Sequence, residues 1–60
     1  MNRTMRFCGE LRRETDGAYL VFEGVSEVWI PKSMAQDVEL TGDLIECTIP
    51  EWLAIEKGVV

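Results

Sequence analysis

The sequence predicts an α+β fold: a small antiparallel β-sheet of four or five strands, closed by one short C-terminal helix. Three observations lead to this prediction. Apolar and polar residues alternate in several short segments, Asp16-Gly17 separates the first two of these segments, and helix-start and helix-stop residues follow the last one. The 60 residues contain no repeat and no linker, so residues 1–60 are expected to form a single domain.

The first segment, residues 4–13, has the two-residue period of a half-buried strand. Its two faces would carry Met5, Phe7, Gly9 and Leu11 on one side, and Arg6, Cys8, Glu10 and Arg12 on the other. Gly9 suggests a bulge or a bend. Asp-Gly between alternating apolar segments is a strong hairpin signal, so residues 18–22 should pair with this strand.

Three further segments complete the predicted sheet. Gly24 marks a turn, and residues 25–30 favour a third strand that ends near Pro31, because proline cannot donate a ladder hydrogen bond. Residues 32–34 should follow an extended or bent path, and residues 35–41 predict a weak strand. After the turn at residues 41–43, residues 44–49 predict the last strand, with Ile45, Cys47 and Ile49 on one face. We expect the sheet to be strongly curled.

Residues 50–58 predict a short helix. Proline suits the first helical position, and Gly58 is placed to cap the C-terminal end. A helix of this length is marginal alone in water and must dock on the sheet. Trp52 and Ile55, three residues apart, are expected to be the docking face, helped by Leu53 and by residues 59–60.

The residue types present argue against an enzyme and against a bound metal or other cofactor. The chain has no His and only two Cys, too few for a zinc site, and its scattered glycines form no phosphate-binding loop. A Cys8–Cys47 disulfide is one reading of the cysteines, but two reduced thiols in a cytosolic protein are better supported. The chain has no long apolar run, and we expect a soluble protein, located in the cytoplasm of a bacterial host, that binds no membrane.

The charges are divided unevenly along the chain. Residues 1–13 carry a net charge of +3, whereas residues 14–60 carry −8. The acidic bulk disfavours nonspecific binding to phosphates, which depends on Lys and Arg. It is compatible with a protein partner whose own surface is basic.

Trp29 is the residue most expected to matter for binding. The strand period places it on the opposite face from Val28 and Ile30, so it is either covered in a core or exposed as an interface anchor. The expected partner-binding residues are Trp29, Lys32, Ser33, Glu27 and Glu39. In an alternative, Arg6, Arg12 and Arg13 bind nucleic acid with Phe7 nearby for stacking. Cross-strand or diagonal pairing of Arg6 and Arg12 with Glu10 is the favoured reading of these arginines.

Two motifs, Val28-Trp29-Ile30-Pro31-Lys32-Ser33 and the segment from Ile49 to Gly58, together resemble small proteins encoded in phage and prophage genomes. The resemblance covers the second half of the chain. It implies an origin and a fold more than an activity. The genes of such proteins often sit among replication, recombination or host-interaction genes, which serve several different activities. It carries over no catalytic residue.

The leading hypothesis is therefore a phage accessory protein that binds and modulates a host protein, as a counter-defence inhibitor of the anti-CRISPR kind would. It would act by occupying a basic surface. An accessory nucleic-acid-binding module of a phage replication or recombination system, and an oligomerisation module, are the alternatives. We also expect a homo-oligomer, because one short helix cannot cover the apolar residues on both faces of the sheet.

Overall fold

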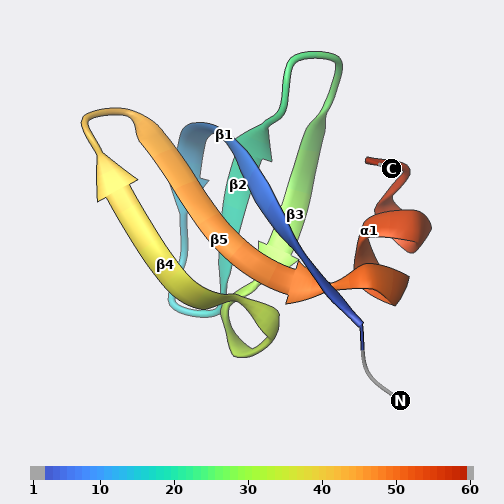
Figure 1. Cartoon of the computed structure of the whole chain (residues 1–60). Coiled ribbons are helices and arrows are strands. Elements are labelled where there is room, and N and C mark those ends of the chain that lie inside the picture. The colour runs from blue at the N-terminus through green and yellow to red at the C-terminus, as the bar shows by residue number, and fades with distance from the viewer. Residues whose placement is uncertain (1–2, 60) are drawn as a thin grey trace.

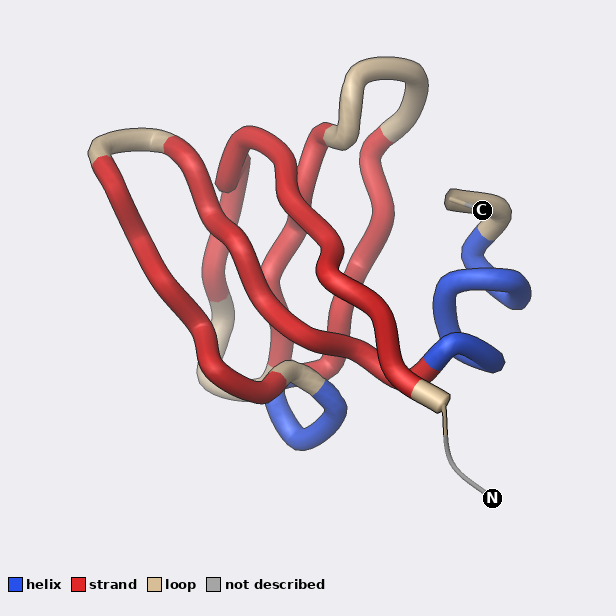
Figure 2. Tube along the Cα trace, viewed as in Figure 1, coloured by secondary structure: helices blue, strands red, loops and turns tan. Residues whose placement is uncertain are grey.

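The computed structural model describes residues 3–59 and confirms an antiparallel sheet followed by a short C-terminal helix (Figure 1). The strands are β1 (Thr4–Glu14), β2 (Ala18–Phe22), β3 (Glu27–Pro31), β4 (Gln36–Thr41) and β5 (Leu44–Pro50). A single 3₁₀ turn, η1 (Lys32–Met34), joins β3 to β4, and the helix α1 (Glu51–Lys57) follows β5 directly (Figure 2). The strand order is β3-β2-β1-β5-β4, which puts the longest strand in the centre.

The β1–β2 hairpin is confirmed, but Thr15 rather than glycine geometry shapes its loop. The hydroxyl of Thr15 accepts hydrogen bonds from the backbone N–H groups of Gly17 (3.3 Å) and Ala18 (3.1 Å). The backbone N–H of Thr15 also donates to the carbonyl of Ala18, at 2.9 Å. A threonine side chain that satisfies the loop amides in this way is a recognised turn former.

The irregularity predicted for β1 lies at Arg12 and not at Gly9. Leu11 pairs with Val21 and Arg13 pairs with Leu20, so Arg12 is the extra residue of a β-bulge. Gly9 is instead a point of close approach between strands. A Cβ atom there would lie 2.5 Å from the backbone oxygen of Phe22 and 2.7 Å from Cγ1 of Val21, so no larger residue fits without a shift.

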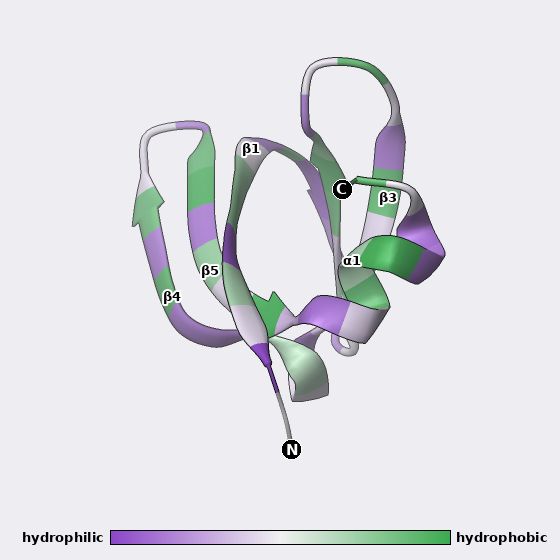
Figure 3. Ribbon diagram, turned by 45° about the vertical axis from the view of Figure 1, so that its right-hand side comes forward, coloured by the Kyte–Doolittle hydropathy of each residue, from purple (hydrophilic) through white to green (hydrophobic). Residues whose placement is uncertain are grey.

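One face of the sheet, the inner face, carries the core. Alternate strand residues point to it, and the change of hydropathy from residue to residue is visible along β4 and β5 (Figure 3). The buried residues are Phe7, Val21, Val28, Ile30, Ile45, Cys47, Ile49, Leu53 and Ala54. All but the last two come from the sheet, and the prediction that Ile45, Cys47 and Ile49 share a face is confirmed.

The expectation of a strongly curled sheet is wrong. The sheet is not strongly curled. It is also not closed, because β3 and β4 form its two edges and do not pair with each other within residues 3–59. The β4–β5 hairpin turns at Gly42, which has a φ of 60°, and β4 carries a second irregularity between Gln36 and Glu39. Asp37 lies in this irregularity with a positive φ of 51°.

The helix is confirmed, but the predicted docking face is wrong. Leu53 and Ala54 are buried, whereas Trp52 and Ile55 remain 55% and 62% exposed. The helix begins directly after β5, so the direction in which the chain leaves β5 determines which helix face meets the core. Pro50 precedes the helix as an extended residue, instead of occupying the first helical position.

The C-terminal end of α1 is capped as the sequence indicates. Gly58 adopts the left-handed conformation with a φ of 77°, its N–H donates to the carbonyl of Ile55, and Val59 donates to Ala54. This pair of hydrogen bonds is a Schellman motif. Val59 packs against the core, while Val60, the other residue of the expected tail contact, lies outside the described residues.

The two cysteines are both free, as the favoured reading expected. Cys8 is exposed on the face opposite the core, whereas Cys47 is buried in the core. Their positions on opposite faces of neighbouring strands keep their side chains apart. No helix formed by residues 3–59 has the length and apolar character needed to cross a membrane.

Candidate functional site

The outer face of the sheet, opposite the core, holds most of the residues that the sequence singled out. The registers align Glu10 with Phe22 and with Leu44, and align Trp29 with Leu20. Residues aligned in an antiparallel sheet point to the same face. The face therefore runs from Trp29 at the β3 edge to Glu39 at the β4 edge.

Three apolar side chains form a patch at the β3 end of this face, which we call the Trp29 patch: Leu20, Phe22 and Trp29. Trp29 is 40% exposed, while Leu20 and Phe22 are half-buried. Of the two readings of this tryptophan, the structure therefore supports the exposed one. Glu27 borders the patch, because it is aligned with Phe22 on β2.

The bulge at Arg12 joins the Trp29 patch to a charge pair. Nε of Arg12 lies 2.8 Å from Oε1 of Glu10, and its guanidinium carbon lies 4.6 Å from the centre of the Phe22 ring. This arrangement is a cation–π contact combined with an ion pair. Arg12 thus covers part of an aromatic side chain and is held by a carboxylate at the same time.

Arg6 is held in a similar way at the β4 end of the face. Its guanidinium lies 3.7 Å from Glu39 and 3.5 Å from Glu46, and it donates a hydrogen bond of 2.8 Å to the hydroxyl of Thr48. Glu39 and Glu46 are aligned directly across β4 and β5. Two like charges in this position repel each other, so Arg6 stabilises the pair.

Arg12 does pair with Glu10, as the favoured reading expected, but the pair lies within β1 and not across strands. Arg6 makes cross-strand pairs, but with Glu39 and Glu46 instead of Glu10. Arg13 is exposed and makes no ion pair with another residue in the described part of the chain. Of the three arginines in the nucleic-acid alternative, two are already engaged with carboxylates. Phe7, the stacking aromatic of that alternative, is buried in the core.

Lys32 does not join the outer face. Its ammonium lies 2.6 Å from Oε2 of Glu14 and 5.1 Å from the centre of the Tyr19 ring. Tyr19 is aligned with the buried Ile30, on the inner side of the sheet. The hydrogen bond with Glu14 raises the pKa of Lys32. Ser33 is exposed in the η1 turn.

The five expected partner-binding residues are thus not one cluster. Trp29 and Glu27 lie together at the β3 edge of the outer face, and Glu39 lies on the same face at the opposite edge. Lys32 is turned toward the other side of the sheet. The two-residue period placed Trp29 on the correct face, and the strand order places Glu39 on that same face at the far edge.

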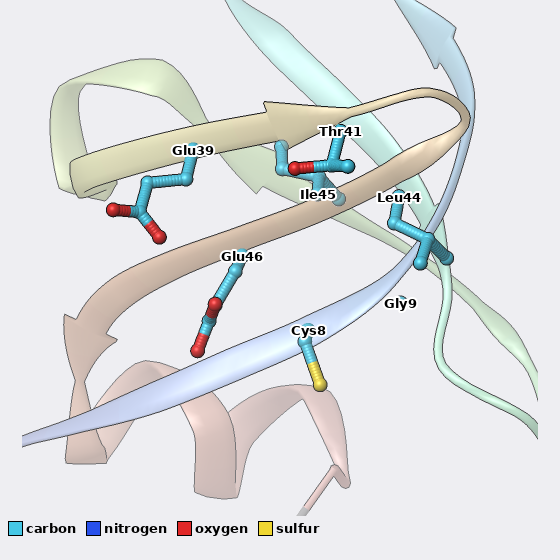
Figure 4. Close-up of a pocket in the computed structure, with 7 residues that line it drawn as sticks. All are labelled: Cys8, Gly9, Glu39, Thr41, Leu44, Ile45 and Glu46. Carbon is cyan, nitrogen blue, oxygen red and sulfur yellow. The ribbon is translucent and has the colours of Figure 1, made fainter.

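Sequence reasoning missed an open pocket of about 450 Å³ on the outer face, at the β4 edge (Figure 4). Its lining residues are Cys8, Gly9, Glu39, Thr41, Leu44, Ile45 and Glu46. The pocket places two carboxylates and a thiol around an apolar wall, with no His in the chain to act as a base. In the described part of the chain, no three His, Cys, Asp or Glu side chains are grouped so as to hold a metal ion.

No family model, no curated protein and no solved structure matches this chain.

Proposed function

We propose that the chain is a protein-binding module of phage origin that binds and modulates a host protein, as a counter-defence inhibitor does. The observation that carries the proposal is the Trp29 patch, an exposed tryptophan supported by Leu20 and Phe22 and bordered by Glu27. Tryptophan is among the residues most enriched at binding hot spots. The resemblance of the two motifs to phage proteins supports the origin.

The charge distribution supports a basic partner. Three of the six cationic side chains, Arg6, Arg12 and Lys32, are paired with glutamates of the same chain. Glu27 and Asp16 make no such pair among the described residues, so their charge is available to a partner. A partner groove built to hold nucleic acid offers the complementary positive charge.

The test is affinity capture from a bacterial lysate, comparing the parent chain with Trp29→Ala and with Glu27→Lys. We expect the parent to retain a basic protein, identified by mass spectrometry, that both variants release. The contact should also weaken with added salt, because it depends on opposite charges. Retention of the same proteins by all three chains would contradict the proposal.

Nucleic-acid binding is the alternative function, and Arg13 is the residue that favours it, because it is exposed near the Trp29 patch and unpaired among the described residues. Electrophoretic mobility shift with single- and double-stranded DNA, at low and moderate salt, separates the two functions. A salt-sensitive shift at micromolar protein that Arg13→Ala abolishes would replace the inhibitor proposal. The proposed function expects no shift.

Self-association is part of the proposal, and the β3 edge is where it is expected. The Lys32 N–H donates to the Gly17 carbonyl, so every second pair from there, including Tyr19 with Ile30, is hydrogen-bonded between β2 and β3. The residues between these pairs, Glu27 and Trp29, therefore direct their backbone N–H and C=O groups away from β2, toward the open edge. The β4 edge is irregular at Asp37, which hinders strand pairing. Light scattering tests this step, and a mass of 6.8 kDa at high micromolar concentration would remove it.

A further inference from the structure

The outward side of α1 is an apolar surface that is separate from the Trp29 patch. Trp52 and Ile55 lie one helical turn apart, and each exposes more than half of its surface. The same helix buries Leu53 and Ala54 in the core. The helix is thus anchored on one side and presents two large apolar side chains on the other.

This surface and the Trp29 patch lie on opposite sides of the molecule. Leu53 and Ala54 belong to the same core cluster as Ile30, so α1 covers the inner face of the sheet. Trp29 lies on the outer face, aligned with Leu20. The only two tryptophans of the chain are therefore separated by the sheet and the core.

The charges around Trp52 and Ile55 indicate the kind of partner. Glu51 lies one turn from Ile55 and Glu56 lies one turn from Trp52, so both carboxylates border the apolar side chains. Lys57 lies one turn from the buried Leu53, away from them. Neither Glu51 nor Glu56 forms an ion pair within the described residues.

The same charges argue against a second copy of the chain as the occupant. In an antiparallel two-fold pairing of two α1 helices, residue 52 of one copy meets residue 55 of the other, and residue 51 meets residue 56. Glu51 would then lie against Glu56 of the second copy at both ends of the contact. Like charges placed together in an interface disfavour it, whereas Lys or Arg side chains would pair with both carboxylates.

We propose that Trp52, Ile55, Glu51 and Glu56 form a second docking surface, the α1 surface, for a protein with an apolar patch ringed by Lys and Arg side chains. This inference goes beyond the proposed function and does not depend on the Trp29 patch. A chain with both surfaces can hold two partner surfaces on opposite sides at once.

The two tryptophans provide the measurement. In the Trp29→Phe variant, Trp52 is the only indole and reports on the α1 surface alone. In the Trp52→Phe variant, Trp29 reports on the outer face alone. The probe is a synthetic amphipathic helical peptide with Leu on one face and Lys on both flanks, and the matched control peptide carries Glu in place of Lys.

We expect the Lys peptide to shift the emission of Trp52 to shorter wavelength, in a saturable and salt-sensitive manner, with or without a response of Trp29. The Glu peptide should have no effect. Replacing Glu51 and Glu56 by Lys should weaken binding about tenfold or more, since charges at the contact fix partner choice. No shift of Trp52, or an equal shift with both peptides, would overturn the proposal.

Two helix variants distinguish a loss of peptide binding from a loss of folding. Ile55→Ala should keep the parent circular dichroism spectrum and lose peptide binding, whereas Leu53→Ala should lower the melting temperature. A peptide response seen only at Trp29 would overturn the α1 surface while leaving the proposed function intact. Association of the chain with itself that Ile55→Ala abolishes would overturn the assignment to a basic partner.

Discussion

The two faces of the sheet are built from the same strands but stabilised by different interactions. On β5, Ile45 is 1% exposed on the inner face, while its neighbour Leu44 is 60% exposed on the outer face. The inner face excludes water and gains from apolar burial. The outer face relies on ion pairs, such as Arg6 with Glu46 and Arg12 with Glu10, whose contribution in water is small.

The outer face is the part of the sheet that tolerates substitution. Stability comes from one face, so the residues of the other face can be chosen for binding at little cost to folding. The Trp29 patch and the pocket beside Cys8 both lie on the outer face. The following experiments test the separation of the faces, beginning with the largest expected effect.

The thiols should give the sharpest contrast. Cys8 is exposed on the outer face, whereas burial on the inner face raises the pKa of the Cys47 thiol and so lowers its thiolate fraction. In the native chain we expect one thiol to react promptly with Ellman's reagent and the second to react only after unfolding. Cys8→Ser should remove the prompt reaction. A prompt reaction of Cys47 in that variant would show that the core is open.

Neighbouring residues of β5 should differ strongly in stability. Ile45→Ala should cost about 2–5 kcal/mol, because it leaves a cavity in the core. Leu44→Ala should change stability by less than about 0.5 kcal/mol, because its side chain is exposed. Urea unfolding followed by circular dichroism measures both.

If Ile45→Ala proves unfolded, Ile45→Val gives a measurable loss of about 0.5–1.5 kcal/mol. Equal effects at the two positions would mean that the faces are not distinct.

Gly9 should be intolerant of a side chain, whereas Gly17 should accept one. In Gly9→Ala the new methyl group meets the backbone oxygen of Phe22, which cannot move aside as a side chain could. We expect a loss of about 1–3 kcal/mol. Gly17→Ala is the matched control, because no atom lies within 4 Å of its added Cβ. A thermal melt compares them, and equal melting temperatures would refute the close approach of β1 and β2.

The smallest effect is expected at the turn between β2 and β3, which belongs to neither face. Hydrogen bonds from the N–H groups of Ser26 (2.6 Å) and Val25 (2.9 Å) lower the pKa of the Glu23 carboxyl. The stabilisation is therefore present above the unfolded pKa of this carboxyl and is lost as pH falls through its lowered folded pKa.

Amide chemical shifts of Val25 and Ser26 should remain constant at neutral pH and change in acid. Glu23→Gln should remove this dependence, and Glu27→Gln should preserve it. An unchanged titration in Glu23→Gln would assign the effect to another group.

Much of the fold follows from local sequence signals. The sequence-based predictions that proved wrong share one cause, which is that they depend on contacts between segments. The strand of residues 18–22 and the cap at Gly58 depend on neighbours in sequence, and both were predicted correctly. The bulge at Arg12 and the role of Gly9 depend on how β1 meets β2, which no local pattern contains. The third strand begins at Glu27 and not at Val25, because residues 23–26 are used by the turn.

The candidate site shows the same limit. The two-residue period predicted that Trp29 faces away from Val28 and Ile30, and it does. The period could not decide whether a second layer covers that face. The pocket combines residues from β1, β4 and β5, so it exists only once the strand order is fixed.

The hairpin, the alternation of faces and the position of the helix follow from the amino-acid sequence, because they depend on backbone preferences and on spacing within a few residues. Tertiary structure alone decided that the sheet stays open, that Leu53 and Ala54 face the core, and that Trp52 faces outward. This short helix has apolar residues on more than one side, so its sequence alone fits more than one docking face. The direction in which β5 delivers the chain selects the side that is buried.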